Sequence, residues 1–312
     1  MSAVAAVVAP VFGAVGLGVA LTRLGVFDAA TGRALVRFMF HLAIPAMLLR
    51  SLATATLPAV LPWRFVLAFY LPSLLLYGLG MRLASRRLGW QTGELAIAGM
   101  AAAYANIVLL GYPLVIGAFG DAGAVPLFIL LAAQSPLFFP LTTWLSERSR
   151  AGSLERPRPG AALRVLVANP VVASLVLGVT VNLIGLRLPS LLDDLLRLIG
   201  SAGPGCALVA LGIGLAQCRV GGDYVAVGLL VAMKNLLHPL AVWGLGHALG
   251  VRADWLAVAV LLAAMPSGVN AYVFASHYGV RETTVSQTIV VSTLVSAVVV
   301  SLLLTHYMPV AP

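Results

Sequence analysis

The sequence predicts an all-α polytopic membrane protein: ten transmembrane helices in two inverted five-helix repeats, with broken helices 4 and 9 that cross. Three observations predict this fold class. First, 61% of the 312 residues are apolar, 9% are charged and the mean hydropathy is +1.03, a composition that excludes an ordinary soluble globule. Second, ten apolar runs follow one another along the chain. Third, prolines recur in the same order in the two halves.

The ten apolar runs are each long enough to cross roughly 30 Å of hydrocarbon. Hydropathy and the glycines, prolines and charges between the runs set their limits. An amphipathic segment at residues 188–199 precedes the seventh span, and we expect this segment to lie at the membrane interface and lead into the span. The predicted spans are residues 3–22, 32–53, 62–83, 94–118, 122–145, 162–184, 201–219, 224–249, 254–277 and 284–306.

The basic residues predict the orientation in the membrane. The net charge of +9 does not indicate nucleic-acid binding, because the arginines lie between spans or at span ends rather than on a soluble face. Thirteen arginines gather on the side of the loops after the odd-numbered spans, and five lie on the other side. The positive-inside rule therefore predicts that both termini lie outside the cytoplasm.

An internal repeat divides the chain into residues 1–146 and 162–312, joined by a short cytoplasmic connector at 147–161. Because each half has five spans, an odd number, the second half must cross the membrane in the opposite sense. The repeat is carried by four pairs of prolines at similar places in the two halves: Pro10 and Pro170, Pro45 and Pro204, Pro72 and Pro239, and Pro113 and Pro266.

The fourth span contains residues that a membrane helix should avoid. Asn106, Gly111 and Pro113 interrupt the apolar stretch 100–116. Glycine weakens a helix, and proline removes a backbone donor and clashes with the preceding turn. In lipid such a break persists only where protein or a water-filled cavity satisfies the freed backbone groups.

The ninth span has a matching break at Pro266, followed by Ser267 and Asn270. Two interrupted helices, one in each half, indicate a transporter's binding site near the middle of the bilayer. The half-helix N-termini after each break carry unsatisfied N–H groups, which suit a carboxylate or a similar anion. The alternative is that the prolines only kink the helices and the asparagines bond to nearby backbone.

Lys234 is the only charged residue well inside any span, where a charge is costly and usually faces a polar interior. We expect it to attract an anionic substrate or to alternate its charge during transport, the alternatives being snorkelling or a bond to freed carbonyls. His238 lies four residues later on the same helical face and is a candidate proton relay, or else a structural histidine.

No catalytic, metal-binding or cofactor motif is present in the sequence, so an enzyme is not predicted. H⁺ and Na⁺ are both candidate coupling ions. No carboxylate lies in the interior of a predicted span, away from its ends, which disfavours a buried acid as the ion ligand. The leading prediction is a secondary transporter for a small organic anion. The alternatives are a Na⁺-coupled organic-anion symporter and a membrane sensor that binds a ligand without moving it.

The broken-helix motifs resemble those of the auxin efflux carrier family, whose architecture is similar to that of the bile acid and sodium symporters. The resemblance covers essentially the whole chain. Asn106 to Leu114 is similar to the family's signature in span 4, and Met265 to Ala275 to its signature in span 9. Lys234, five residues before Pro239, matches the family's basic residue ahead of a proline.

This resemblance implies a scaffold of spans 1, 2, 6 and 7 and a moving transport domain of spans 3–5 and 8–10. It also implies elevator-like motion, substrate binding near Asn106, Pro113 and Pro266, and a homodimer formed through the scaffold in the lipid membrane. Plant members of the family export auxin, and bacterial members are often described as malonate or malate permeases. The short connector and Asn270 depart from the plant pattern, so auxin is not the expected substrate.

Overall fold

The structure is a computed structural model that describes residues 3–57, 61–150, 170–218, 221 and 223–307. The described residues form helices and no named strand, which confirms the predicted all-α class. The connector was predicted at residues 147–161, and its residues 151–161 lie outside the described part of the chain.

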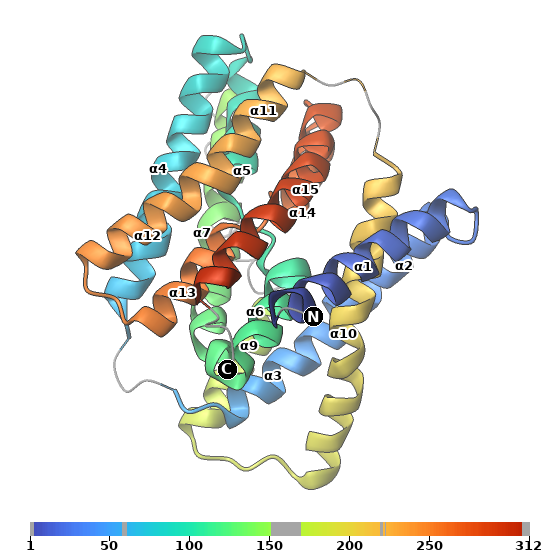
Figure 1. The fold of residues 1–312 in the computed structure, drawn as a ribbon, viewed down its shortest axis with the longest axis vertical. Helices are drawn as coiled ribbons and strands as arrows, with labels where there is room; N and C mark the ends of the chain where they lie inside the picture. The colour runs from blue at the N-terminus through green and yellow to red at the C-terminus, as the bar shows by residue number, and fades with distance from the viewer. Residues whose placement is uncertain (1–2, 58–60, 151–169, 219–220, 222, 308–312) are drawn as a thin grey trace.

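The first half runs from α1 to α7 (Figure 1). The letter η marks short π or 3₁₀ turns within or between the α-helices. The elements are α1 (Ala3–Arg23), α2 (Ala29–Phe38), η1 (Met39–Ala43), α3 (Ile44–Thr54), α4 (Trp63–Arg87), α5 (Thr92–Ala103), η2 (Ile107–Gly111), α6 (Tyr112–Phe119), η3 (Gly120–Gly123) and α7 (Ala124–Arg150).

The second half runs from α9 to α15. Its elements are α9 (Pro170–Leu183), α10 (Ser190–Ala216), α11 (Tyr224–Ala232), η4 (Met233–Leu237), α12 (His238–Ala248), α13 (Ala253–Ala263), α14 (Val269–Tyr278) and α15 (Glu282–Tyr307). The predicted interfacial segment and the seventh span form one continuous helix, α10, because Gly200 and Pro204 do not interrupt it.

Seven helices of the described residues are long and apolar enough to cross a membrane, judged by length and composition. The predicted number was ten. The difference arises where spans are divided, since α13 has 11 residues, and where a span is described only in part, since residues 162–169 of the predicted sixth span lie outside the described residues. The stretch from Ile107 to Ser149 counts as one apolar helix of 43 residues. A turn at Gly120, whose φ is +58°, divides this stretch between α6 and α7.

Three prolines lie just after a π-helical turn. Pro45, Pro113 and Pro239 are each the second residue of an α-helix that follows η1, η2 or η4. A proline has no N–H to donate, and its ring crowds the carbonyl four residues earlier. The wider π turn relieves this crowding, so the helix bends and continues.

The helices pack as two groups (Figure 1). In the first group, α10 contacts α1, α2 and α3, and α3 contacts α9. In the second group, α4 packs on α5 and α12, α5 on α7, α12 on α13, and α11 and α14 on α15. Small residues bring α1 and α10 together, since a Cβ added to Gly212 would lie 2.1 Å from the Val15 carbonyl oxygen.

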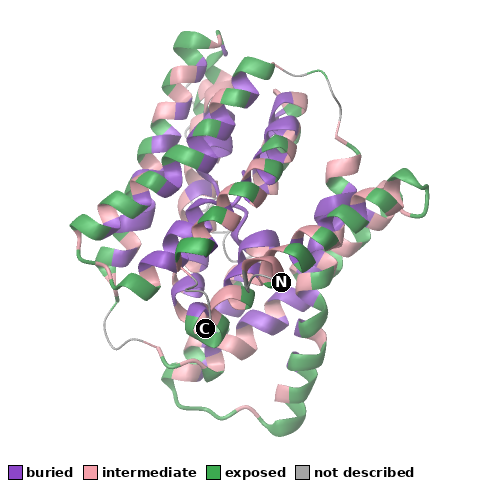
Figure 2. Cartoon of the chain, viewed as in Figure 1, coloured by how far each residue is buried: buried purple, intermediate pink, exposed green. Residues whose placement is uncertain are grey.

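The core of the molecule lies along α5 and α13. Every residue from Ala96 to Ala103 and from Leu256 to Ala263 is buried, whereas one side of α10 and α12 is exposed (Figure 2). A helix that is apolar all round belongs to a protein core or a membrane span, and these two stretches are covered by other helices of the protein. These two buried helices both end at the centre of the second group, where the chain leaves helical geometry.

Candidate functional site

The two predicted helix breaks meet in space. Residues 104–106 and 264–268 leave helical geometry and pair as a short antiparallel bridge centred on Ala105 and Ser267. The Asn106 N–H donates to the Pro266 carbonyl oxygen at 3.0 Å, and the Gly268 N–H donates to the Tyr104 carbonyl oxygen at 2.8 Å. Each break therefore satisfies backbone groups that the other has freed, as a non-helical segment inside a membrane protein requires.

The first break lies earlier in the chain than Pro113 suggested. The chain leaves helical geometry at residues 104–106, whereas Gly111 and Pro113 belong to the helix that follows. Gly111 instead permits close packing, because a Cβ there would lie 2.8 Å from Leu262 Cδ2. In the second break, Pro266 lies within the non-helical segment, as the sequence predicted.

Gly268 is required by the close approach of the two breaks. A Cβ added at this position would lie 2.4 Å from Cδ1 of Tyr104 and 3.3 Å from the Ala105 carbonyl oxygen. Its φ of −70° is open to any residue, so the requirement is steric and not conformational.

Two buried polar atoms at the crossing have no hydrogen-bond partner among the described residues, namely Nδ2 of Asn106 and Oγ of Ser267. Asn106 is 5% exposed and Ser267 is 0% exposed. The other amide atom of Asn106, Oδ1, accepts from the Leu109 N–H at 3.3 Å and so caps η2. Buried polar groups are nearly always paired, so these two atoms are donors available to a ligand or a water molecule.

Other polar side chains at the crossing form hydrogen bonds to the first break. Asn270 Nδ2 donates to the Tyr104 hydroxyl at 3.1 Å, which in turn lies 3.0 Å from Ser135 Oγ. Gln134 Nε2 donates to the Ala105 carbonyl oxygen at 2.9 Å. Side chains from α7 and α14 therefore fix the position of the first break.

Lys234 and Asn235 bind the carboxyl end of α13. The Lys234 ammonium is completely buried and donates to the Ala263 carbonyl oxygen at 2.6 Å. The Asn235 amide donates at 3.2 Å to the carbonyl oxygens of Ala264 and Ser292. A cation at the negative end of a helix is electrostatically favourable. This geometry matches the alternative that the sequence left open for Lys234, a bond to freed carbonyls.

His238 extends this contact to α4. The Ser73 hydroxyl donates its single proton to the Phe69 carbonyl oxygen at 2.7 Å, so it accepts from His238 Nε2 at 2.8 Å. Nδ1 of the ring therefore has a free lone pair and accepts from Lys234 Nζ at 3.2 Å. The chain of hydrogen bonds ends at a main-chain carbonyl, which cannot take up a proton.

The structure brings most of the predicted site residues together at the crossing. Lys234 and His238 lie beside it, where Lys234 bonds to the carboxyl end of α13. Sequence reasoning did not single out Tyr104, Asn235, Ser73 or Ser292, whose roles depend on contacts between distant elements. Asn235 alone carried a signal, because an amide beside Lys234 in an apolar helix needs a partner. The described residues contain no group of three or more His, Cys, Asp or Glu that could hold a metal ion.

Comparisons with known proteins show which family the chain resembles. Residues 3–304 match the family described as membrane transport protein. A Rhizobium meliloti (strain 1021) protein named "Putative malonate transporter" is 28% identical over 312 residues, which cover 97% of this chain and 96% of that protein. An "Uncharacterized transporter" of Methanothermobacter thermautotrophicus is 28% identical over 285 residues, 90% of this chain and 91% of that protein.

The plant relatives match a smaller part. "Auxin efflux carrier component 2" of Arabidopsis thaliana is 29% identical over 140 residues, 43% of this chain and 22% of that protein. The family and these relatives are transporters and not enzymes. Because the family match extends over nearly the entire sequence, the chain belongs to the membrane transport protein family, that is, the auxin efflux carrier family of integral membrane transporters.

Proposed function

We propose that this protein is a secondary active transporter for a small organic anion, a carboxylate, which binds where the two broken helices cross. The observation that carries this proposal is the pair of buried, unpartnered polar atoms at the crossing, Asn106 Nδ2 and Ser267 Oγ. Both can donate a hydrogen bond to a carboxylate oxygen.

Helix polarity supports an anion over a cation at this place. The segment formed by η2 and α6 begins at Ile107 and α14 begins at Val269, so two helix N-termini start at the crossing. Helix N-termini carry partial positive charge and N–H groups without helical partners. The opposite ends, the carboxyl ends of α5 and α13, are covered by Gln134, Lys234 and Asn235.

The architecture that we propose has ten spans in two inverted repeats, with divided helices α5/α6 and α13/α14 as spans 4 and 9. The helix group of α1, α2, α3, α9 and α10 is the scaffold, and two copies of the protein form a homodimer through this scaffold. The group of α4 to α7 and α11 to α15 is the transport domain, moving like an elevator past the scaffold. Both termini lie outside the cytoplasm of the bacterial plasma membrane.

Lys234 and His238 are the candidate groups for proton coupling in this proposal. The hydrogen-bond chain from Lys234 through His238 to Ser73 joins the end of α13 to α12 and α4. A change in the charge of Lys234 alters its bond to Ala263 and with it the position of the second break. Because the Lys234 ammonium is bonded to the Ala263 carbonyl oxygen, the substrate can bind Lys234 only if this hydrogen bond breaks during transport.

Uptake by proteoliposomes tests the proposal. Purified protein is reconstituted, and uptake of labelled malonate, malate and a monocarboxylate is measured with and without a proton gradient. Saturable uptake of at least one carboxylate is expected, with malonate tested first because of the Rhizobium relative's name. Folded protein that transports none of these anions would contradict the proposal. Binding without counterflow would instead indicate a sensor.

A Na⁺-coupled symporter is the second candidate, favoured by one observation. Asn235 Oδ1 is buried and has no donor among the residues that the structure describes. An amide oxygen is a suitable ligand for a hard cation, which would satisfy this acceptor. Replacing Na⁺ with choline in the same uptake assay separates the two candidates, since only the symporter loses its uptake.

A further inference from the structure

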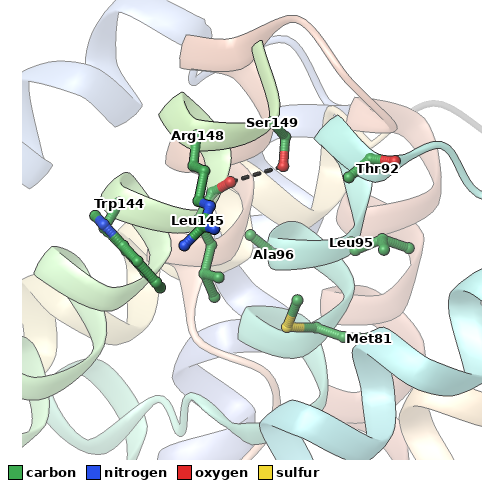
Figure 3. A pocket seen from close by; sticks show the side chains of 8 residues that line it. All are labelled: Met81, Thr92, Leu95, Ala96, Trp144, Leu145, Arg148 and Ser149. Atoms are coloured by element: carbon green, nitrogen blue, oxygen red, sulfur yellow. Dashed lines mark hydrogen bonds between the residues drawn. The ribbon is translucent and has the colours of Figure 1, made fainter. Parts of the chain in front are cut away.

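A cleft lies away from the crossing, where α4 and α7 end and α5 begins (Figure 3). Its volume is about 320 Å³. Figure 3 shows the side chains of α7 on one side and those of α5 on the other, with Met81 of α4 beside them. The lining residues are Met81, Thr92, Leu95, Ala96, Trp144, Leu145, Arg148 and Ser149.

The wall of the cleft combines apolar side chains with one cation. The Arg148 guanidinium lies 5.4 Å from the centre of the Trp144 ring, a cation–π contact. Arg148 is exposed and takes part in none of the ion pairs found among the described residues. Ser149 cannot donate into the cleft, because its hydroxyl donates to the Leu145 carbonyl oxygen at 2.8 Å. Arg148 is therefore the charged donor available to a ligand.

The cleft lies at the predicted boundary of the membrane. The third predicted span ends at residue 83, the fourth begins at residue 94 and the fifth ends at residue 145. The residues that line the cleft lie close to these three limits. Tryptophan favours this boundary because its ring is amphipathic. The last turns of α4 also carry three exposed arginines, Arg82, Arg86 and Arg87, which do not line the cleft. An apolar wall with the Arg148 cation at this depth matches the two parts of an anionic lipid.

We propose that this cleft binds one anionic phospholipid, whose phosphate contacts Arg148 and whose upper acyl chain lies against Leu95, Ala96 and Leu145. Basic pockets between membrane helices are a known way of holding such headgroups. A zwitterionic lipid presents the same phosphate together with a cation, which Arg148 repels.

The cleft and the crossing are connected by one helix, α5. Thr92, Leu95 and Ala96 belong to α5, and α5 ends at Ala103, directly before the first break. A lipid in the cleft therefore contacts the helix that leads to the crossing. The lipid site itself does not depend on which molecule the crossing binds.

Native mass spectrometry of the purified full chain in detergent tests the proposal. Phosphatidylglycerol or phosphatidylcholine is titrated, and bound lipids are counted for the wild type, Arg148→Gln and Arg64→Gln. Arg64 is the matched control, since it is exposed and lies 5.3 Å from the Trp63 ring but does not line the cleft. Thr92→Trp narrows the cleft without a change of charge. Size-exclusion chromatography and thermal unfolding verify that each variant is folded.

The expected result is one preferred phosphatidylglycerol in the wild type and in Arg64→Gln, and about fivefold weaker binding in Arg148→Gln, from the roughly 1 kcal/mol that one surface cation contributes. Thr92→Trp should also lose the preferred lipid. Unchanged binding in either cleft variant would overturn the assignment, as would an equal loss in Arg64→Gln. Displacement by soluble glycerol phosphate would show that the site takes a free phosphate and not a lipid.

Discussion

Replacing Ser267 with alanine should separate the stability of the fold from binding at the crossing. The Ser267 hydroxyl is 0% exposed and has no partner among the described residues. A buried unsatisfied polar group costs about 1 to 3 kcal/mol, so its removal should leave the free energy of unfolding unchanged or raise it. A hydrogen bond to a charged group contributes about 1.5 to 3 kcal/mol, so loss of this donor should weaken anion affinity roughly tenfold to a hundredfold.

The neighbouring Ser292 is the matched control for this prediction. Its hydroxyl accepts from the Ser267 N–H at 3.1 Å and donates to the Ile289 carbonyl oxygen at 3.0 Å. Ser292→Ala should therefore reduce the free energy of unfolding by about 1 to 3 kcal/mol, because a buried N–H loses its acceptor. Thermal unfolding and carboxylate uptake are measured for both variants. Ser267→Ala protein that is destabilised, or that transports with unchanged affinity, would refute the argument.

Substitutions at Asn106, Lys234 and Gly212 test the crossing and the packing around it. Asn106→Asp keeps an oxygen that caps η2 but replaces the free amide donor with a carboxylate oxygen, so it should lose at least tenfold in uptake affinity for an anion. Because that carboxylate is buried without a partner, the variant should also be less stable than the wild type. Asn106→Ala removes both the cap and the donor and should lose about 1 kcal/mol of stability. Lys234→Met leaves the Ala263 carbonyl without its side-chain donor and should lower the melting temperature; a stable variant with weakened anion affinity would instead favour direct substrate contact. Gly212→Ala places a Cβ 2.1 Å from the Val15 carbonyl oxygen, so α1 and α10 must separate and the protein should unfold at lower temperature, whereas Gly214→Ala, with open space around it, should not.

The sequence alone predicts the helical class because apolar runs and their interruptions are local properties of the chain. It also places Asn106 and Ser267 at helix breaks. The exact location of the first break was not predictable, since Pro113 lies in a continuous helix after a π turn. The break at residues 104–106 depends on hydrogen bonds to residues 266–268, about 160 positions away in the chain, and no local pattern encodes that pairing.

Lys234 shows the same limit for a side chain. Its burial within a membrane helix could be read from the apolar residues around it, and so could the need for a polar partner. The sequence left open a bond to freed main-chain carbonyls, but it could not identify Ala263 as the partner, because every residue possesses such a carbonyl. The unpaired state of Asn106 Nδ2 is equally a property of the folded chain and not of the residue type.

The antiparallel bridge between the two breaks has a consequence for how such a protein can change. Its hydrogen bonds join main-chain atoms only, so they do not depend on which side chains stand at Ala105 and Ser267. Mutation can exchange the groups that face a ligand while the frame that holds them persists. The exception is Gly268, where any Cβ would collide with Tyr104. Redesign of specificity should therefore vary residues 106, 267 and 270 and keep residue 268 fixed.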